Sequence, residues 1–130
     1  MSFDKEVAAR INENKNNKTL KVVDDQIGSP TATTEAAAAI CQLLEKKPQG
    51  LFHFAADGYV SRFEMAKFIF EKLNISVDLK NCKTTDFPSA ATRPLNSRFN
   101  CDKIKQLLTE PIKHWKQPLE QFLNQLSPIL

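Results

Sequence analysis

The sequence predicts an α/β fold, which would be an α+β arrangement if the chain folds as an isolated fragment, and three observations carry this prediction. Apolar residues recur at helical spacing in several segments, and short β-like runs alternate with those segments along the chain. The 130 residues, 42% hydrophobic and 25% charged, have the length and composition of one ordinary globular domain or a large piece of one. We therefore expect one folded unit over residues 1–130, with roughly five helices and three or more short strands.

The first third of the chain supplies a helix, a strand and a second helix. Apolar residues at every fourth position predict an amphipathic helix over residues 2–15. A first strand is expected over residues 19–24 because apolar and β-branched residues cluster there. Thr33 or Thr34 can then cap an alanine-rich helix that runs to about Lys46.

A short apolar run over residues 51–56 follows Gly50. Such a run suits a strand that is covered on both faces, as in the parallel sheet of an α/β fold. His53 lies within the run, where a partly buried, hydrogen-bonded histidine is the expected state and a catalytic histidine is the alternative.

Three further elements and a long loop complete the chain. Ser61 begins a capping-box pattern at the start of a broadly apolar helix, and residues 75–79 alternate as a half-buried strand does. Residues 82–99 follow no period and predict a long loop, which inside a compact domain is often functional. Two helices close the chain, the first of them capped by Asn100.

Charge and cysteine usage argue against several function classes. The net charge is +3, from 18 Lys and Arg against 15 Asp and Glu, and the basic residues are scattered, so neither a nucleic-acid nor a membrane surface is expected. No apolar run approaches the ~20 residues of a transmembrane helix, and the first residues show no signal-peptide pattern. Three widely spaced cysteines fit free thiols better than disulfides or metal ligands, so we expect a cytoplasmic protein with no bound metal.

The loop of residues 24–31 gathers polar side chains between the first strand and the alanine-rich helix. Two carboxylates, an amide and two hydroxyls stand beside Gly28 and Pro30, which constrain the path of the chain. On chemistry alone, this loop is either a turn whose side chains satisfy free backbone groups or one wall of a ligand site.

Arg93 is the candidate binding residue of the second loop. It precedes Pro94 and is therefore biased towards an extended conformation. Its guanidinium suits a phosphate or a carboxylate ligand, and a surface salt bridge is the alternative.

Several catalytic motifs are absent from the chain. Its three glycines, Gly28, Gly50 and Gly58, are too far apart for a Gly-rich phosphate loop. The single tyrosine, Tyr59, is followed four residues later by Phe63, so there is no Tyr-x-x-x-Lys pair. No Ser-His-Asp or Cys-His arrangement stands out. The residues alone thus predict an α/β piece with two polar loops that can bind a ligand.

Four motifs in order along the chain resemble the dTDP-4-dehydrorhamnose reductase family, a group of extended short-chain dehydrogenases/reductases. The resemblance covers nearly the whole chain and rests on a strand and loop, a Gly-aromatic-His run, a helix start and an Arg-Pro-x-Asn-Ser segment: residues 22–31, 50–54, 58–66 and 91–97. It implies NAD(P)H-dependent reduction of dTDP-4-dehydro-L-rhamnose to dTDP-L-rhamnose for polysaccharide biosynthesis, on a Rossmann-type fold.

The resemblance further implies which part of such an enzyme this chain represents. The family's cofactor loop and catalytic Tyr/Lys pair lie in its N-terminal half, so we expect the C-terminal substrate-binding part, inactive by itself, with residues 32–56 joining the cofactor domain. No catalytic or cofactor-binding residue is assigned to this chain. The expected partners are a dTDP-sugar and the N-terminal Rossmann half. The implied substrate contacts are Gln26, Gly28, Ser29, Pro30, Thr31 and Arg93, with Asn96 as support.

Two other functions and one assembly state stay open at this point. The same fold family includes the regulatory beta subunit of methionine adenosyltransferase, so a non-catalytic regulatory or interaction subunit is one alternative. A free-standing α/β binding module is another. A homo-oligomer is also expected if residues 51–56 form a strand with no partner, because unpaired apolar edges promote pairing.

Overall fold

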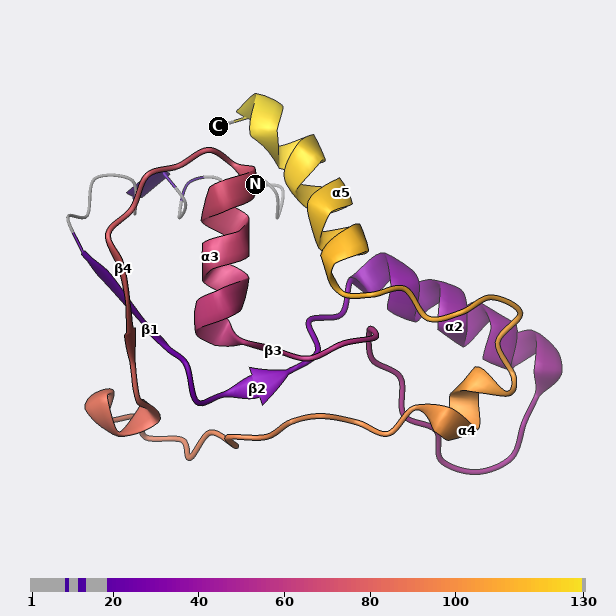
Figure 1. Ribbon diagram of the computed structural model, residues 1–130. Coiled ribbons are helices and arrows are strands. Elements are labelled where there is room, and N and C mark those ends of the chain that lie inside the picture. Colours follow the sequence, from indigo (N-terminus) through magenta and orange to yellow (C-terminus); the bar gives the residue numbers. More distant parts are fainter. Residues whose placement is uncertain (1–8, 10–11, 14–18, 130) are drawn as a thin grey trace.

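The computed structural model describes residues 9, 12, 13 and 19–129 of the chain. Two parallel strands with a helix packed against them form one part of it (Figure 1). β1 (Leu20–Val23) pairs with β4 (Leu79–Cys82), with Leu20 opposite Leu79 and Val23 opposite Cys82. Parallel neighbours need a long crossover connection. α3 (Arg62–Lys72) lies within that crossover and contacts both strands.

A second helix covers α3 on the side away from the strands. α5 (Lys116–Leu126) lies beside α3 in Figure 1 and contacts it. Its Leu123 and Leu126 are 3% and 1% exposed, which accounts for its amphipathic sequence. At its start, the Trp115 ring meets Phe68 of α3 edge-on, with ring centroids 5.3 Å apart.

The other part of the molecule is built around α2 (Thr33–Lys46) and the short α4 (Asp102–Lys105), with the chain before Asp57 between them. Its core is small, with Ile104 1% exposed at the centre. Ala55 and Cys101 complete the buried cluster, and five half-buried apolar residues pack around it: Leu43, Phe52, Phe54, Leu108 and Ile112.

A small three-segment sheet connects the two parts. β2 (Ile27–Gly28) pairs antiparallel with β3 (Val60–Ser61). On the other edge of β2, the Ile27 amide donates to the Leu95 carbonyl at 2.8 Å, and the Ser97 amide donates to the Ile27 carbonyl at 2.9 Å. Segments that lie far apart in the sequence therefore meet at Ile27.

The helix boundaries largely follow the sequence pattern. The Ser61 hydroxyl caps α3 by accepting from the Glu64 amide at 3.1 Å, as the capping-box pattern predicts. The predicted Asn100 cap of α4 was wrong by one position, because Cys101 occupies the N-cap; the Asn100 carboxamide lies just before it and accepts from the Asp102 amide at 2.8 Å. The predicted cap of α2 was wrong, because Ala32 occupies the N-cap and no side chain bonds there.

The predicted strand over residues 51–56 is not formed. These residues run extended without a ladder partner, because no described strand lies alongside them. Side chains bond to this backbone instead: the Lys103 ammonium donates to the Leu51 carbonyl at 2.8 Å, and the Ala56 amide donates to the Thr31 hydroxyl at 3.0 Å. The expectation that His53 is partly buried was also wrong, since it is exposed and stacks on Phe99.

Three other predictions need comment. The strand predicted over residues 75–79 was largely wrong: β4 begins only at Leu79, and just before it the Asp78 carbonyl accepts from the Leu20 amide at 2.8 Å. The predicted long loop over residues 82–99 is confirmed from residue 83 on, since Cys82 is the last residue of β4; it contains the 3-10 turn η1 (Thr84–Asp86) and one bridge at Asn96. A second 3-10 turn, η2 (Ser127–Ile129), follows α5. The helix predicted over residues 2–15 lies almost wholly outside the described residues. The α/β class itself is confirmed, with four α-helices and four short strands in the described part of the chain.

Candidate functional site

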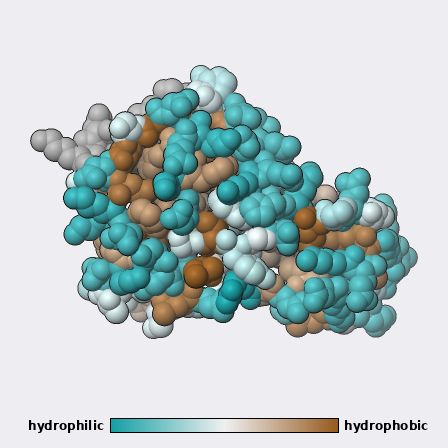
Figure 2. Space-filling model, in the orientation of Figure 1, coloured by the Kyte–Doolittle hydropathy of each residue, from teal (hydrophilic) through white to brown (hydrophobic). Residues whose placement is uncertain are grey.

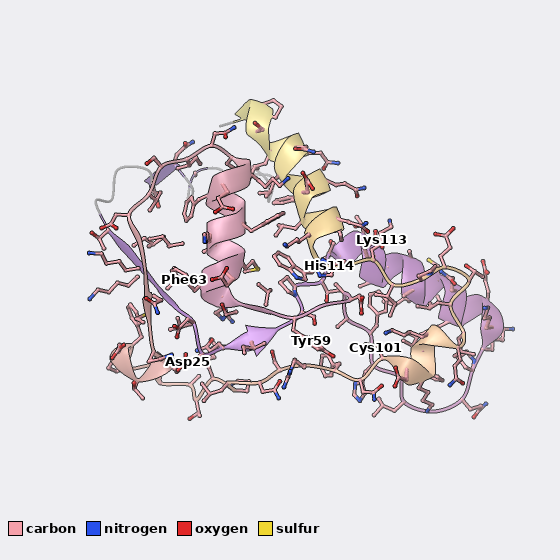
Figure 3. The ribbon with its side chains drawn as sticks, viewed as in Figure 1. Asp25, Tyr59, Phe63, Cys101, Lys113 and His114 are labelled. Carbon is pink, nitrogen blue, oxygen red and sulfur yellow. The ribbon has the colours of Figure 1, made fainter. Side chains whose placement is uncertain are left out.

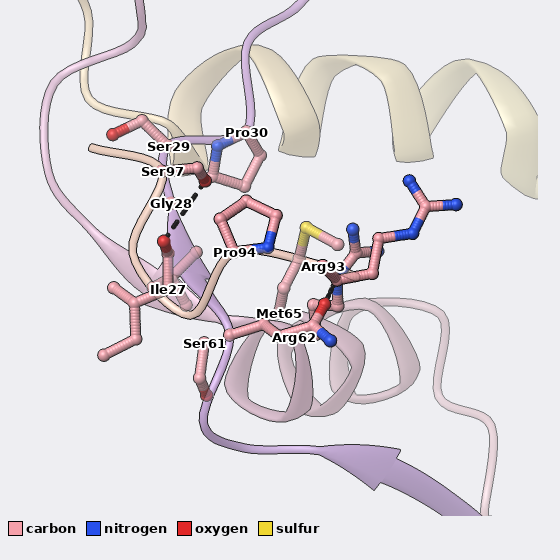
Figure 4. Close-up of a pocket in the computed structure, with 12 residues that line it drawn as sticks. Ile27, Gly28, Ser29, Pro30, Ser61, Arg62, Met65, Arg93, Pro94 and Ser97 are labelled. Atoms are coloured by element: carbon pink, nitrogen blue, oxygen red, sulfur yellow. Dashed lines mark hydrogen bonds between the residues drawn. The ribbon is translucent and has the colours of Figure 1, made fainter. Parts of the chain in front are cut away.

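A pocket of about 360 Å³ opens where the small sheet meets the start of α3 (Figure 4). Three separate stretches form its wall: the loop after β1, the β3–α3 junction and the loop before α4. The lining residues are Gln26, Ile27, Gly28, Ser29, Pro30, Val60, Ser61, Arg62, Met65, Arg93, Pro94 and Ser97.

The charge of this pocket is entirely positive. Arg62 and Arg93 line it, and no carboxylate does. Within the described residues, neither guanidinium lies within salt-bridge distance of an acidic side chain. Two guanidinium groups without a carboxylate partner suit an anion that carries several oxygens.

The pocket floor is closely packed around Gly28. The Ser97 hydroxyl donates to the Ile27 carbonyl at 3.2 Å, and a Cβ at position 28 would lie 2.6 Å from that same hydroxyl oxygen. Pro30 and Pro94 lie near this contact in Figure 4. Glycine at position 28 therefore lets the loop before α4 approach β2 and close one side of the pocket.

Five of the residues assigned through the family resemblance line the pocket: Gln26, Gly28, Ser29, Pro30 and Arg93. The structure thus brings the 26–30 loop and Arg93 together. Thr31 and Asn96 do not line the pocket, and their assignment stays a prediction.

The hydroxyl and amide groups of the predicted site have protein partners. The Ser29 hydroxyl donates to the Gly58 carbonyl at 2.7 Å, and the Thr31 hydroxyl donates to the Ser29 carbonyl at 3.0 Å. The Asn96 carboxamide accepts from the Arg98 amide and from its Nε, at 3.1 and 2.9 Å. These three side chains hold the loops in shape.

Arg62 was not among the site residues predicted from the sequence, and Gln26 holds it at the pocket. The Gln26 carbonyl accepts from the Arg62 amide at 3.2 Å, and the Gln26 side chain accepts from Arg62 Nε at 2.8 Å. A cation in the first turn of a helix opposes the helix dipole, which favours anions there. This unfavourable placement is the sequence signal that could have identified Arg62.

A carboxylate-rich turn lies behind Gln26, at the end of β1 and beside η1 (Figure 3). Asp25 accepts from the Thr84 hydroxyl at 2.7 Å and from the Thr84 amide, and these bonds lower the pKa of Asp25. Its neighbour Asp24 accepts from the Lys83 ammonium and from the Asn81 amide, and both bonds lower the pKa of Asp24. The Asp24 carboxylate in turn raises the pKa of Lys83.

The three glycines of the chain lie apart from one another in the structure. Gly28 lies in β2, and Gly50 and Gly58 lie in separate turns with positive φ, so no glycine-rich loop faces a helix N-terminus. Among the residues that the structure describes, no group of three His, Cys, Asp or Glu side chains is placed to hold a metal ion. Nor is any helix of this described part long and apolar enough to cross a membrane.

Comparison with known proteins decides the family. The family model described as "RmlD substrate binding domain" matches residues 3–127. The chain belongs to this family. Its pocket residues therefore lie on a substrate-binding domain of the RmlD type, and the family resemblance read from the sequence is confirmed.

Several relatives support this membership. The chain is 35% identical over 118 residues to the dTDP-4-dehydrorhamnose reductase of Aggregatibacter actinomycetemcomitans, covering 82% of this chain and 40% of the relative. It is 32% identical over 108 residues to the spore coat polysaccharide biosynthesis protein SpsK of Bacillus subtilis, covering 83% of this chain and 38% of that protein. The chain spans about two fifths of the length of the curated relatives it matches.

Solved structures agree with the sequence matches. The structure of a dTDP-4-dehydrorhamnose reductase from Clostridium acetobutylicum superposes with a TM-score of 0.83 at 33% identity, covering 98% of this chain and 44% of that one. The reductase of Bacillus anthracis, solved in complex with NADP, gives a TM-score of 0.82 at 30% identity, covering 96% and 43%. These structures confirm the mixed α/β fold.

Proposed function

We propose that this chain is the nucleotide-sugar-binding part of a dTDP-4-dehydrorhamnose reductase, which reduces dTDP-4-dehydro-L-rhamnose to dTDP-L-rhamnose with NAD(P)H. The observation that carries the proposal is the pocket with Arg62, Arg93 and no carboxylate. A dTDP-sugar carries a diphosphate, whose oxygens match the paired donors of a guanidinium. The pocket also has apolar walls at Ile27, Val60 and Met65, which suit a base or a sugar face.

We further propose that the 130-residue chain has no reductase turnover of its own. It contains neither a glycine-rich phosphate loop nor a Tyr-x-x-x-Lys pair. In a longer protein of the family, the hydride donor would then be bound outside this chain. We also propose a cytoplasmic location for this chain. Its cysteines Cys41, Cys82 and Cys101 are all free thiols, which supports that proposal.

Residues 32–56 carry a surface that suits contact with the cofactor domain of a longer reductase. On α2, Ile40 and Leu44 are 56% and 68% exposed and lie one turn apart, and Leu51 beyond the helix is 73% exposed. In Figure 2, hydrophobic atoms reach the surface on the side of the molecule where α2 and α4 lie in Figure 1. The extended residues 51–56 add backbone groups without a ladder partner.

Calorimetric titration with dTDP-rhamnose tests the binding proposal. We expect Arg93→Ala to weaken binding by roughly 10- to 150-fold, because a hydrogen bond to a charged group contributes about 1.5–3 kcal/mol. Lys67→Ala is the matched control, since it also removes one positive charge but lies outside the pocket lining. Equal binding by wild type and Arg93→Ala would remove Arg93 from the ligand contacts, and no binding at all by wild type would contradict the proposal.

Sedimentation velocity tests the exposed surface of α2. Without a cofactor domain to cover it, we expect the chain to self-associate as its concentration rises, and Ile40→Glu to suppress this association. Lys47→Glu, at the polar end of the same helix, serves as the charge control. A strictly monomeric wild type at high concentration would contradict this surface proposal.

A further inference from the structure

Three hydrogen bonds run in one direction from the pocket to Asp25. Arg62 Nε donates to Gln26 Oε1 at 2.8 Å, and Gln26 Nε2 donates to Thr84 Oγ1 at 3.1 Å. The Thr84 hydroxyl in turn donates to Asp25 Oδ1 at 2.7 Å. Each side chain donates a hydrogen bond to the next, and the last acceptor is the carboxylate of Asp25.

The direction of this series is set by Asp25. A hydroxyl can donate only one hydrogen bond, and the Thr84 hydroxyl donates it to the Asp25 carboxylate, which can only accept. Gln26 must therefore donate to Thr84 through its Nε2 group, and the opposite side of its amide, Oε1, must face Arg62. An amide fixed in this way accepts from Arg62 and cannot turn to repel it.

The anchor of the series is itself well held. The Thr84 amide donates to both oxygens of Asp25, at 3.1 and 3.0 Å, at the start of η1. Thr84 is half-buried, whereas its neighbour Thr85 is exposed.

Arg62 is exposed at the pocket rim. An unrestrained arginine there would sample many rotamers, and the entropy lost when a ligand orders it would weaken binding.

We propose that Thr84, with Gln26 and Asp25, is a positioning group that presents the guanidinium of Arg62 to the diphosphate of a nucleotide ligand. Arg62 lines the pocket and Gln26 engages only its Nε, which leaves the two Nη groups of the guanidinium to bind an anion. Thr84 does not line the pocket and acts only through Gln26 and Arg62. This inference rests on the proposed function, because it names how that same pocket holds its anion.

The first test uses the chain without ligand. In the wild type, the NMR signal of the Arg62 Nε–H should be resolved and slow to exchange, because it is hydrogen bonded. Thr84→Val should lose this signature, Thr84→Ser should retain it, and Thr85→Val should leave it unchanged. If Thr84→Val fails to fold, Gln26→Leu breaks the same series one bond earlier and should abolish the same signal. An Arg62 signal that is unaffected by either variant overturns the proposal.

The second test titrates dTDP. Thr84→Val should weaken dTDP binding by roughly 3- to 10-fold, the range expected for one lost hydrogen bond, and Thr84→Ser should restore it. In an Arg62→Ala background, Thr84→Val should have no further effect, since Thr84 acts through Arg62. The same fold-loss in both backgrounds, or no loss in either, overturns the positioning role and leaves the proposed function intact. Absence of dTDP binding by the wild type overturns the proposed function and the ligand assignment together.

Discussion

Gly28 is the position at which the pocket floor leaves no space for a side chain. A Cβ placed there would lie 2.6 Å from Ser97 Oγ, too close for a carbon and an oxygen that are not bonded to each other. The glycines with positive φ are Gly50 and Gly58, so the backbone at position 28 can accept other residues. The conflict that Gly28→Ala introduces is therefore steric and involves one oxygen atom.

We expect Gly28→Ala to lower the free energy of unfolding by roughly 0.5–2 kcal/mol. Adding a methyl group to a well-packed core costs about 1–3 kcal/mol, and the low end of that range applies here because Ser97 is exposed. If the Ser97 hydroxyl rotates away, it also loses its 3.2 Å bond to the Ile27 carbonyl, worth about 0.5–1.5 kcal/mol. Replacing glycine by alanine stabilises by about 0.4–1 kcal/mol through the unfolded chain, which offsets part of the loss.

Ser97→Ala provides the matched background, because it removes the oxygen that collides. The next atom, Ser97 Cβ, lies 3.9 Å from the added carbon, an ordinary contact distance. In this background, Gly28→Ala should be neutral or stabilising by up to about 1 kcal/mol, so its effect changes sign. Urea unfolding of the wild type, the two single variants and the double variant can be followed by the fluorescence of Trp115, the single tryptophan, which is 4% exposed. Equal destabilisation by Gly28→Ala in both backgrounds would refute the steric argument.

Three other perturbations have expected outcomes. Ile104→Ala should lower the free energy of unfolding by about 2–5 kcal/mol and Ile104→Val by about 0.5–1.5 kcal/mol, because this side chain is 1% exposed; thermal unfolding would measure both, and a stable alanine variant would contradict the core assignment. Gly58→Ala should also destabilise, since φ is +81° and the added Cβ would overlap the His114 ring; unchanged urea stability would count against this. The pKa of Asp25 is lowered in the folded chain by its bonds to Thr84, so its contribution to stability is complete above the ordinary carboxyl pKa of about 4 and is lost as the pH falls through the lowered value. Asp25→Asn should therefore reduce the loss of urea stability on acidification, and an unchanged pH profile would contradict this assignment.

Local patterns account for the parts of the fold that were predicted correctly. α3 begins where Ser61 can cap it, and α5 repeats its apolar residues at helical spacing, so each helix depends on residues a few positions apart. A strand needs a neighbour, and periodicity cannot reveal whether one is present. For that reason residues 51–56 look like a strand in sequence but run without a ladder partner in the structure.

In the candidate site, too, some residues could be predicted from local sequence and others depend on tertiary contacts. Residues 26–31 and Arg93 were selected from their side-chain types and from the family resemblance, and most of them line the pocket. Arg62 was missed because one cation in the first turn of a helix, although unfavourable there, does not by itself indicate a binding site. Its importance depends on Gln26 and Thr84, which are distant in the sequence and meet only through the pairing of β1 with β4.

The sequence by itself determined the α/β class, the main helices, the two polar loops and the family to which the chain belongs. Each of these depends on spacing or residue type within short stretches. Only the tertiary structure decided that the two loops form one pocket, because Ile27 pairs with β3 on one edge and with the backbone around Asn96 on the other. It alone also decided the direction of the series from Arg62 to Asp25, since a hydrogen bond between distant side chains exists only when folding brings donor and acceptor within about 3 Å.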